Sequence, residues 1–123
     1  MDASKTMWHL PETLLEIEEG GDDSIVLELI DSFQNDTANR FERLHDAVAR
    51  LDAATVKAEA HAMRGGARQM GAEALAALCQ AVEAGAPEMN WPELEYQVKQ
   101  AEARFAEVGS TMSEYVEARQ RAG

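Results

Sequence analysis

Apolar residues recur along the chain in steps of three and four, which is the period of an amphipathic helix. No stretch shows the strict alternation that is typical of a strand. The longest stripe consists of Val26, Ile30, Phe33, Thr37, Phe41, Leu44, Val48 and Leu51. Further helical patterns cover residues 53–70, 72–84 and 91–119, and a shorter one covers residues 12–19. The pattern predicts an all-α protein.

Turn and capping residues separate these predicted helices. Gly20-Gly21 ends the short first helix, and one of the polar residues 22–24 (Asp-Asp-Ser) caps the second. Asp52 is the expected N-cap of the third helix, and Gly71 interrupts the chain before the fourth. The segment Gly85-Ala86-Pro87 ends the fourth helix, because glycine favours the C-cap and proline cannot continue a helix.

Short connections between amphipathic helices predict antiparallel neighbours. The expected fold is therefore an antiparallel four-helix bundle with a short additional N-terminal helix. The later helices contribute to its core Leu75, Leu78, Cys79, Val82, Leu94, Val98, Ala101, Phe105, Val108, Met112 and Val116. We expect one domain, residues 1–123, with a bundle core at about 22–118 and frayed ends at MDASK and ARQRAG.

Composition and charge narrow the possible partners and the location. The 23 acidic residues outnumber the 11 lysines and arginines, and the net charge of −12 makes nucleic acid a poor partner. A single cysteine, Cys79, rules out an intramolecular disulfide, and the N-terminus lacks the features of a signal peptide. No apolar run approaches the roughly 18 residues of a membrane span. We therefore expect a cytoplasmic protein that binds neither nucleic acid nor membrane.

The charge is uneven along the chain. Residues 57–72 hold three cations and one acid, a net charge of +2, so the rest of the chain carries −14. The same segment includes a histidine and the pair Gly65-Gly66, although each glycine inside a helix costs about 1 kcal/mol relative to alanine. A basic segment that tolerates this cost in an acidic protein is a candidate functional site.

A helical wheel advancing about 100° per residue separates this segment into two faces. The core face holds Val56, Ala60, Met63, Ala67 and Met70. His61 lies on the opposite face, and the residues within about 60° of it are Lys57, Ala58, Arg64, Gly65, Arg68 and Ala72. Gln69 lies on the shoulder, at about 80°. The wheel thus predicts a solvent-facing histidine among cations and small residues.

This arrangement suits phosphoryl chemistry. A phosphoryl group on an imidazole nitrogen brings about two negative charges, and Arg64 at i+3 can approach it. Gly65 at i+4 leaves room beside the imidazole for a docking protein, whereas Gly66 on the flank allows close helix packing. A solvent-facing histidine is more often inert than functional, so the hypothesis depends on these neighbours.

Other chemistries find little support in the sequence. It has no glycine-rich phosphate loop, no nucleophile elbow and no Cys/His set with metal-ligand spacing. Glu42 and His45 form one Glu-x-x-His pair of the di-iron type, but such a site requires a second copy and two further glutamates. We expect no metal site, and keep a metal-binding bundle around this pair as the weakest alternative.

The run His61 to Ala72, HAMRGGARQMGA, followed by Leu75, Leu78-Cys79 and Glu83, resembles the histidine-containing phosphotransfer (HPt) family. The motif of that family reads roughly His-x-Leu-Lys-Gly-Ser-Ser-x-x-x-Gly-Ala, with Leu, Leu-Cys and Glu at the same offsets. The resemblance covers about residues 20 to 118. It departs from the motif at Arg64, where lysine is usual, and at Gly66, where serine is common.

The resemblance implies a phosphoryl carrier without an ATP site or autokinase activity. His61 would be the phosphoacceptor, Arg64 would neutralise the phosphoryl charge and Gly65 would give the partner clearance. The residues implied in partner binding are Lys57, Ala58, Arg68, Gln69 and Ala72. The partner would be the receiver domain of a response regulator or of a hybrid sensor histidine kinase, and it would supply the Mg²⁺. We expect a monomer without a cofactor of its own, relaying phosphate between receiver aspartates.

An alternative from another class is a docking module, in which the same bundle binds a receiver or a kinase without carrying phosphate. Substitution of His61 by alanine separates the two hypotheses. Loss of the relay with binding retained supports phosphotransfer, whereas unchanged signalling supports the docking module.

Overall fold

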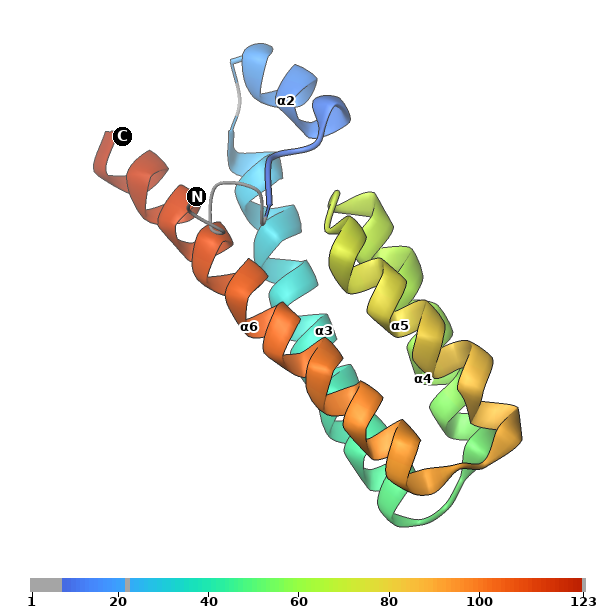
Figure 1. Ribbon diagram of the computed structural model, residues 1–123. Helices are drawn as coiled ribbons and strands as arrows, with labels where there is room; N and C mark the ends of the chain where they lie inside the picture. Colours follow the sequence, from blue (N-terminus) through green and yellow to red (C-terminus); the bar gives the residue numbers. More distant parts are fainter. Residues whose placement is uncertain (1–7, 22, 123) are drawn as a thin grey trace, which may run out of the picture.

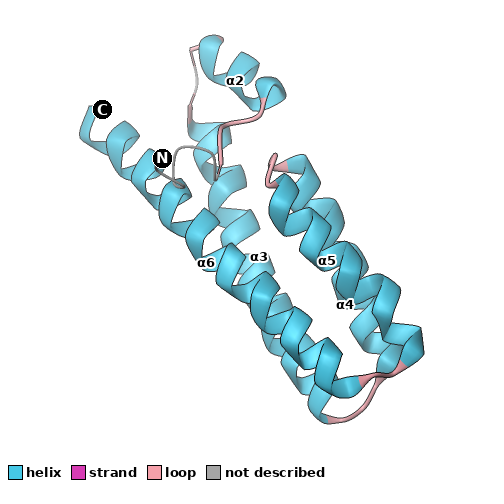
Figure 2. Ribbon diagram, viewed as in Figure 1, coloured by secondary structure: helices cyan, strands magenta, loops and turns pink. Residues whose placement is uncertain are grey.

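The computed structural model describes residues 8–21 and 23–122, and within these ranges it contains helices and no strands (Figure 2). The helices are α2 (Glu12–Glu19), α3 (Ser24–Ala49), α4 (Ala53–Gln69), α5 (Glu73–Gly85), the 3₁₀ turn η1 (Ala86–Glu88) and α6 (Trp91–Ala122). Figure 1 shows α3 to α6 as an antiparallel bundle, with α2 beyond one end of it. The predicted bundle with a short additional N-terminal helix is confirmed.

The four bundle helices differ in length, and this determines the shape of the molecule. Helices α3 and α6 have 26 and 32 residues, whereas α4 and α5 have 17 and 13. At about 1.5 Å per residue, α6 is therefore about 48 Å long and α4 about 26 Å. The hairpin of α4 and α5 lies beside the end of α3 and α6 at which α3 connects to α4 and α5 to α6 (Figure 1).

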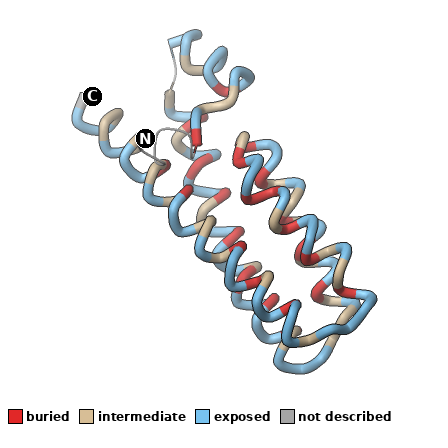
Figure 3. Tube along the Cα trace, viewed as in Figure 1, coloured by how far each residue is buried: buried red, intermediate tan, exposed pale blue. Residues whose placement is uncertain are grey.

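Buried residues follow the inner sides of the helices (Figure 3), largely where the apolar stripes predict them. Val26, Ile30, Phe33, Thr37, Phe41 and Leu44 are buried in α3, and Leu94, Val98, Ala101, Val108 and Met112 are buried in α6. Phe105 is partly buried, and its ring lies 5.5 Å from that of Phe41 and 6.1 Å from that of Phe33. Aromatic contacts of this kind join α3 to α6 across the core.

The prediction that Leu51 belongs to the core is wrong. Helix α3 ends at Ala49, and Leu51 follows in the left-handed region with φ of 57° and a side chain that is 61% exposed. The amide of Asp52 then donates to the carbonyl of Ala47 at 2.9 Å, which is a helix-ending bond. The helix ends two residues before Leu51, and the turn directs the Leu51 side chain into solvent.

The start of α3 and the end of α5 lie at the predicted residues, but the local geometry there is not the one expected. Asp23 occupies the N-cap position of α3, but its side chain makes no capping hydrogen bond. Helix α5 ends at Gly85, within the predicted segment, but Gly85 is right-handed and the left-handed residue is Met89, after η1. Asp52 does cap α4 as predicted, because its carboxylate accepts from the Thr55 amide at 3.1 Å.

The segment before α2 covers the end of the α4–α5 hairpin. Trp8 is buried, and its indole N–H donates to the carbonyl of Met70 at 2.6 Å. The Trp8 ring packs edge-on against Tyr115 of α6, with centroids 5.9 Å apart. Arg119, near the end of α6, stacks over Tyr115 at 4.0 Å and donates to both carboxylate oxygens of Glu18. These contacts attach α2 to the bundle.

The structure describes only part of the two chain ends that we expected to be frayed. MDASK and Gly123 lie outside the described residues, whereas residues 118–122 of ARQRAG continue helix α6.

Candidate functional site

The core and solvent faces of α4 are those that the wheel predicts. Val56, Ala60, Met63 and Ala67 are buried, and so is Met70 directly after the helix. His61 lies on the opposite face, with 64% of its side chain exposed. The imidazole is therefore accessible from solvent, on a helix whose other face is fixed by the core.

Two charged side chains contact the same nitrogen of His61. Nδ1 lies 2.8 Å from Oε2 of Glu83, which comes from the neighbouring helix α5. It also lies 3.1 Å from Nη2 of Arg64, one turn further along α4. The Nε of Arg64 is in turn 3.2 Å from the other Glu83 oxygen, Oε1, so the three side chains form a closed group.

The contacts of this group indicate that Nδ1 of His61 carries a proton. An ionised carboxylate can only accept hydrogen bonds, so the short contact to Glu83 requires a proton on Nδ1. Nδ1 then cannot also accept from Arg64, and Arg64 is held by its ion pair with Glu83 instead. We infer the Nδ1–H tautomer, which leaves the lone pair on Nε2 for a reacting group.

Glu83 belongs to the site, but the helical wheel of α4 does not predict it, because Glu83 lies on α5. Its side chain is 17% exposed, and it follows the buried Val82 on α5. The available signal was its place in the HPt-like motif, where it stands at a fixed offset from the histidine. The wheel of a single helix does not show which residue of a neighbouring helix faces that histidine.

The remaining predicted residues are mostly exposed on the same face. Lys57, Ala58, Gly65, Arg68 and Gln69 are exposed, and Arg64 is half-buried beside Glu83. Arg68 approaches the side-chain oxygen of Gln80 at 3.5 Å. These residues are therefore accessible from solvent, as His61 is, and Lys57 and Ala58 also line a hollow beside it.

Ala72 is the exception, and its placement on the outer face is wrong. Helix α4 ends at Gln69, and Gly71 turns the chain with φ of 73°. The rotation of 100° per residue no longer applies beyond that point, and Ala72 is 1% exposed, at the start of α5. A buried Ala72 cannot contact a partner.

The two helical glycines differ in what surrounds them. A Cβ atom at Gly65 would meet nothing within 4 Å beyond its own helical turn, whereas one at Gly66 would lie 3.9 Å from the Phe33 ring. A separation of 3.9 Å is an ordinary van der Waals contact, so the packing against Phe33 does not require glycine at position 66. No described residue requires glycine at position 65 either, so the space beside Gly65 is open.

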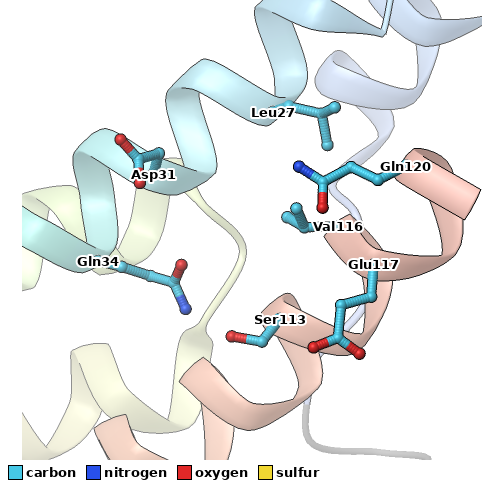
Figure 4. Close-up of a pocket in the computed structure, with 7 residues that line it drawn as sticks. All are labelled: Leu27, Asp31, Gln34, Ser113, Val116, Glu117 and Gln120. Atoms are coloured by element: carbon cyan, nitrogen blue, oxygen red, sulfur yellow. The ribbon is translucent and has the colours of Figure 1, made fainter.

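An open hollow of about 450 Å³ adjoins His61 and is lined by Ala54, Lys57, Ala58, His61 and Glu83. A different hollow of about 380 Å³ lies between α3 and α6 (Figure 4). It is lined by Leu27, Asp31, Gln34, Ser113, Val116, Glu117 and Gln120, which are separate from the residues around His61. The hollow between α3 and α6 is therefore separate from the site, whereas the hollow of about 450 Å³ adjoins it.

Other reactive residues lie away from this site. Cys79 is buried, and burial raises the pKa of its thiol to about 12, so it remains a protonated packing residue. His45 on α3 bonds Glu102 of α6 at 2.9 Å. Within residues 8–21 and 23–122, no three His, Cys, Asp or Glu side chains are grouped to hold a metal ion. No helix in the same ranges is long and apolar enough to cross a membrane.

Comparisons with known proteins agree with this geometry. The family model described as Hpt domain matches residues 28–118. The chain also matches the crystal structure of histidine-containing phosphotransfer protein B from Pseudomonas aeruginosa PAO1, with a TM-score of 0.77 and 29% identity. That match covers 92% of this chain and 96% of the other. The comparison with curated proteins gave no match.

Proposed function

Because the chain belongs to the Hpt domain family, a family of histidine phosphotransfer domains, we propose that it relays a phosphoryl group between receiver-domain aspartates through His61. One observation supports this proposal above the others. Nδ1 of His61 lies 2.8 Å from Oε2 of Glu83, and the Nδ1–H tautomer that we infer from this contact leaves the Nε2 lone pair on an imidazole that is 64% exposed.

In the proposed reaction, the Nε2 lone pair attacks the phosphorus atom of an aspartyl phosphate. The Nε2–P bond forms, the P–O bond to the aspartate breaks, and the electron pair of that bond leaves with the carboxylate. The Nδ1 proton stays in place, so the imidazole becomes positively charged and Glu83 balances that charge. The second transfer, to another aspartate, is the reverse of the first.

The receiver domain supplies the remaining parts of this reaction. Members of the family interact with receiver domains, and the Mg²⁺ and the aspartyl phosphate would lie on the receiver. On this chain, Ala58 and Gly65 leave space on either side of His61 for the approach of that domain. A cation on the outer face of α4 would neutralise phosphoryl charge once the group is transferred; the family motif suggests Arg64 for this role, and Lys57 is exposed on the same face. This division of roles requires neither a cofactor nor an ATP site on this chain.

The test is phosphate uptake from a phosphorylated receiver domain. We expect the protein to gain an acid-labile, base-stable phosphate, and His61→Gln to abolish the labelling. His45→Gln is the matched control, because His45 is also exposed on a helix and also bonded to a glutamate, at 2.9 Å. Labelling that persists in His61→Gln would contradict the proposal.

The same experiment separates phosphotransfer from the docking alternative. A folded protein that binds receiver domains in a pull-down but gains no label from any of them would be a docking module. Binding without transfer would then direct attention to Arg64 and Gly66, the two positions at which the chain departs from the family motif.

A further inference from the structure

The cations on the outer face of α4 differ in whether they already form an ion pair with a carboxylate. Arg64 lies 3.2 Å from Glu83 and is 23% exposed. Lys57 is exposed, and among the residues that the structure describes it has no carboxylate within 4 Å. In a chain with a net charge of −12, a lysine without an acidic partner is unusual and is free to bind an anion.

Lys57 also lines the hollow beside His61, which Arg64 does not. Of the described residues that line the hollow of about 450 Å³, Lys57 is the one cation, and Arg64 is not among them. Arg64 instead lines an adjacent hollow of about 310 Å³, which Lys57 also borders. Lys57 therefore reaches the space next to the imidazole without any rearrangement.

Helix geometry places the His61 side chain on the Lys57 side of its own turn. Side chains on an α-helix lean toward the N-terminus, so each covers the turn before its own Cα atom. Arg64 accordingly leans back onto Nδ1 of His61, at 3.1 Å. His61 leans in the same sense over the turn that holds Lys57 and Ala58, and these residues line the hollow with it.

Moving Arg64 to the phosphoryl group would carry an electrostatic cost. Oε1 of Glu83 is buried, has no hydrogen-bond partner in the described structure and is balanced by its ion pair with Arg64. If Arg64 left, that buried carboxylate oxygen would lose its counter-ion, which is destabilising. The ammonium of Lys57 can approach Nε2 without breaking any such pair.

We propose that Lys57 is the cation that binds the phosphoryl group on Nε2 of His61, while Arg64 remains bonded to Glu83. This inference rests on the proposed phosphotransfer function and deepens it. Lys57 forms no covalent bond and transfers no proton in the step. Its ammonium pairs with phosphoryl oxygens as the Nε2–P bond forms and the bond to the leaving group breaks.

A small phosphoryl donor tests the inference apart from partner docking. The full chain is incubated with phosphoramidate, whose P–N bond breaks with release of ammonia, and phosphohistidine is followed by ³¹P NMR. We expect Lys57→Met to slow labelling roughly five- to tenfold, the effect of losing one partly exposed ion pair of about 1 kcal/mol. Lys57→Arg should restore most of the rate, because the charge is retained.

Lys99→Met is the matched control. It removes the same side chain from an exposed position on α6, so it changes the net charge equally. We expect its labelling rate to stay within about twofold of the wild-type rate, as for an exposed surface pair. A ³¹P titration adds an independent readout, since losing a nearby cation should raise the pKa of the phosphoryl group in Lys57→Met.

The outcomes distinguish this inference from the function on which it rests. If the wild type is labelled and Lys57→Met is labelled as fast as Lys99→Met, Lys57 does not bind the phosphoryl group, and relay through His61 stands. If neither phosphoramidate nor a phosphorylated receiver labels the wild type, the proposed function fails, and the role of Lys57 fails with it.

Discussion

His61 is held from one edge of its ring. Glu83 and Arg64 both contact Nδ1, and the opposite nitrogen, Nε2, forms no hydrogen bond with any of the described residues. A carboxylate at Nδ1 orients the ring and would stabilise the positive charge that forms if Nε2 is phosphorylated as proposed. The same carboxylate needs Arg64 as a counter-ion because it is largely buried. Each of the three side chains thus depends on the other two.

Position 65 allows the clearance role to be separated from helix stability. We expect Gly65→Ala to raise the free energy of unfolding by about 0.5–1 kcal/mol, because alanine is the better helix former and its Cβ meets open space. The same Cβ should slow transfer from a receiver domain roughly fivefold, equivalent to about 1 kcal/mol of docking energy. Urea unfolding and receiver-to-His61 transfer kinetics measure the two effects.

Gly66→Ala is the comparison for that prediction. Its Cβ also has room, at 3.9 Å from Phe33, but it lies on the flank of the helix. We expect a similar gain in stability with little change in transfer. Equal slowing of transfer in both variants would show that Gly65 has no special clearance role.

At the residue scale, the sequence predicts those site features that depend on one helix. The placement of His61, Lys57 and Gly65 on the outer face of α4 follows from its 3.6-residue period. Glu83 could not be derived in the same way, because its contact with His61 depends on how α5 packs against α4. Ala72 was misplaced because the wheel was extended beyond the end of its helix.

At the scale of one element, the N-cap of α4 provides a pH-dependent prediction. Hydrogen bonds from the Thr55 hydroxyl and amide hold the pKa of the Asp52 carboxyl below its usual value. Because the folded pKa is depressed, the ionised cap stabilises the protein above the unfolded pKa of about 4. That contribution is lost as the pH falls through the folded pKa.

We therefore expect Asp52→Ala to be less stable than the wild type at pH 7, with the difference shrinking below about pH 4. Urea unfolding followed by circular dichroism between pH 3 and 7 measures this. Asp46→Ala, at an exposed position near the end of α3, is a suitable control. A difference that stays constant down to pH 3 would contradict the assigned role of the carboxylate.

The helices themselves were well predicted, and the errors lie at their ends. The apolar residues of α3 and α6 repeat in steps of three and four over many turns. One or two residues that fit this period by chance therefore hardly change the prediction of a helix. A helix end depends on a few residues, and Leu51 shows the consequence. It continues the apolar stripe in sequence, but the chain has already turned there with φ of 57°. Helix α5 does end at Gly85, as predicted, but the left-handed residue follows only at Met89, after η1.

At the scale of the whole molecule, the unequal helix lengths leave the upper parts of α3 and α6 without α4 and α5 beside them (Figure 1). Trp8 and α2 occupy this end. Their position was not predictable from periodicity, because it depends on contacts such as Trp8 to Met70, which are 62 residues apart, and Glu18 to Arg119, which are 101 apart. Local patterns carry no information about such pairs.

Trp8 is the residue to test at this scale. We expect Trp8→Phe to lower the free energy of unfolding by about 1 kcal/mol, because it removes the hydrogen bond to Met70 but keeps an aromatic ring. Trp8→Ala should cost about 3 kcal/mol or more, since it also leaves a cavity against Tyr115. Urea unfolding followed by circular dichroism measures both. If the two variants are equally stable, the ring contributes nothing to the attachment of this segment.

The site also has a particular place in the order of synthesis. His61, Arg64 and Glu83 all belong to α4 and α5, two consecutive helices joined by a three-residue turn at residues 70–72. Contacts between neighbouring segments form quickly, because little chain entropy is lost in closing a short loop. A growing chain thus contains every side chain of this group with residues 84–123 still to be added. It then lacks α6, the helix that completes the burial of its apolar face, so the chemical groups are present before the fold that holds them is stable.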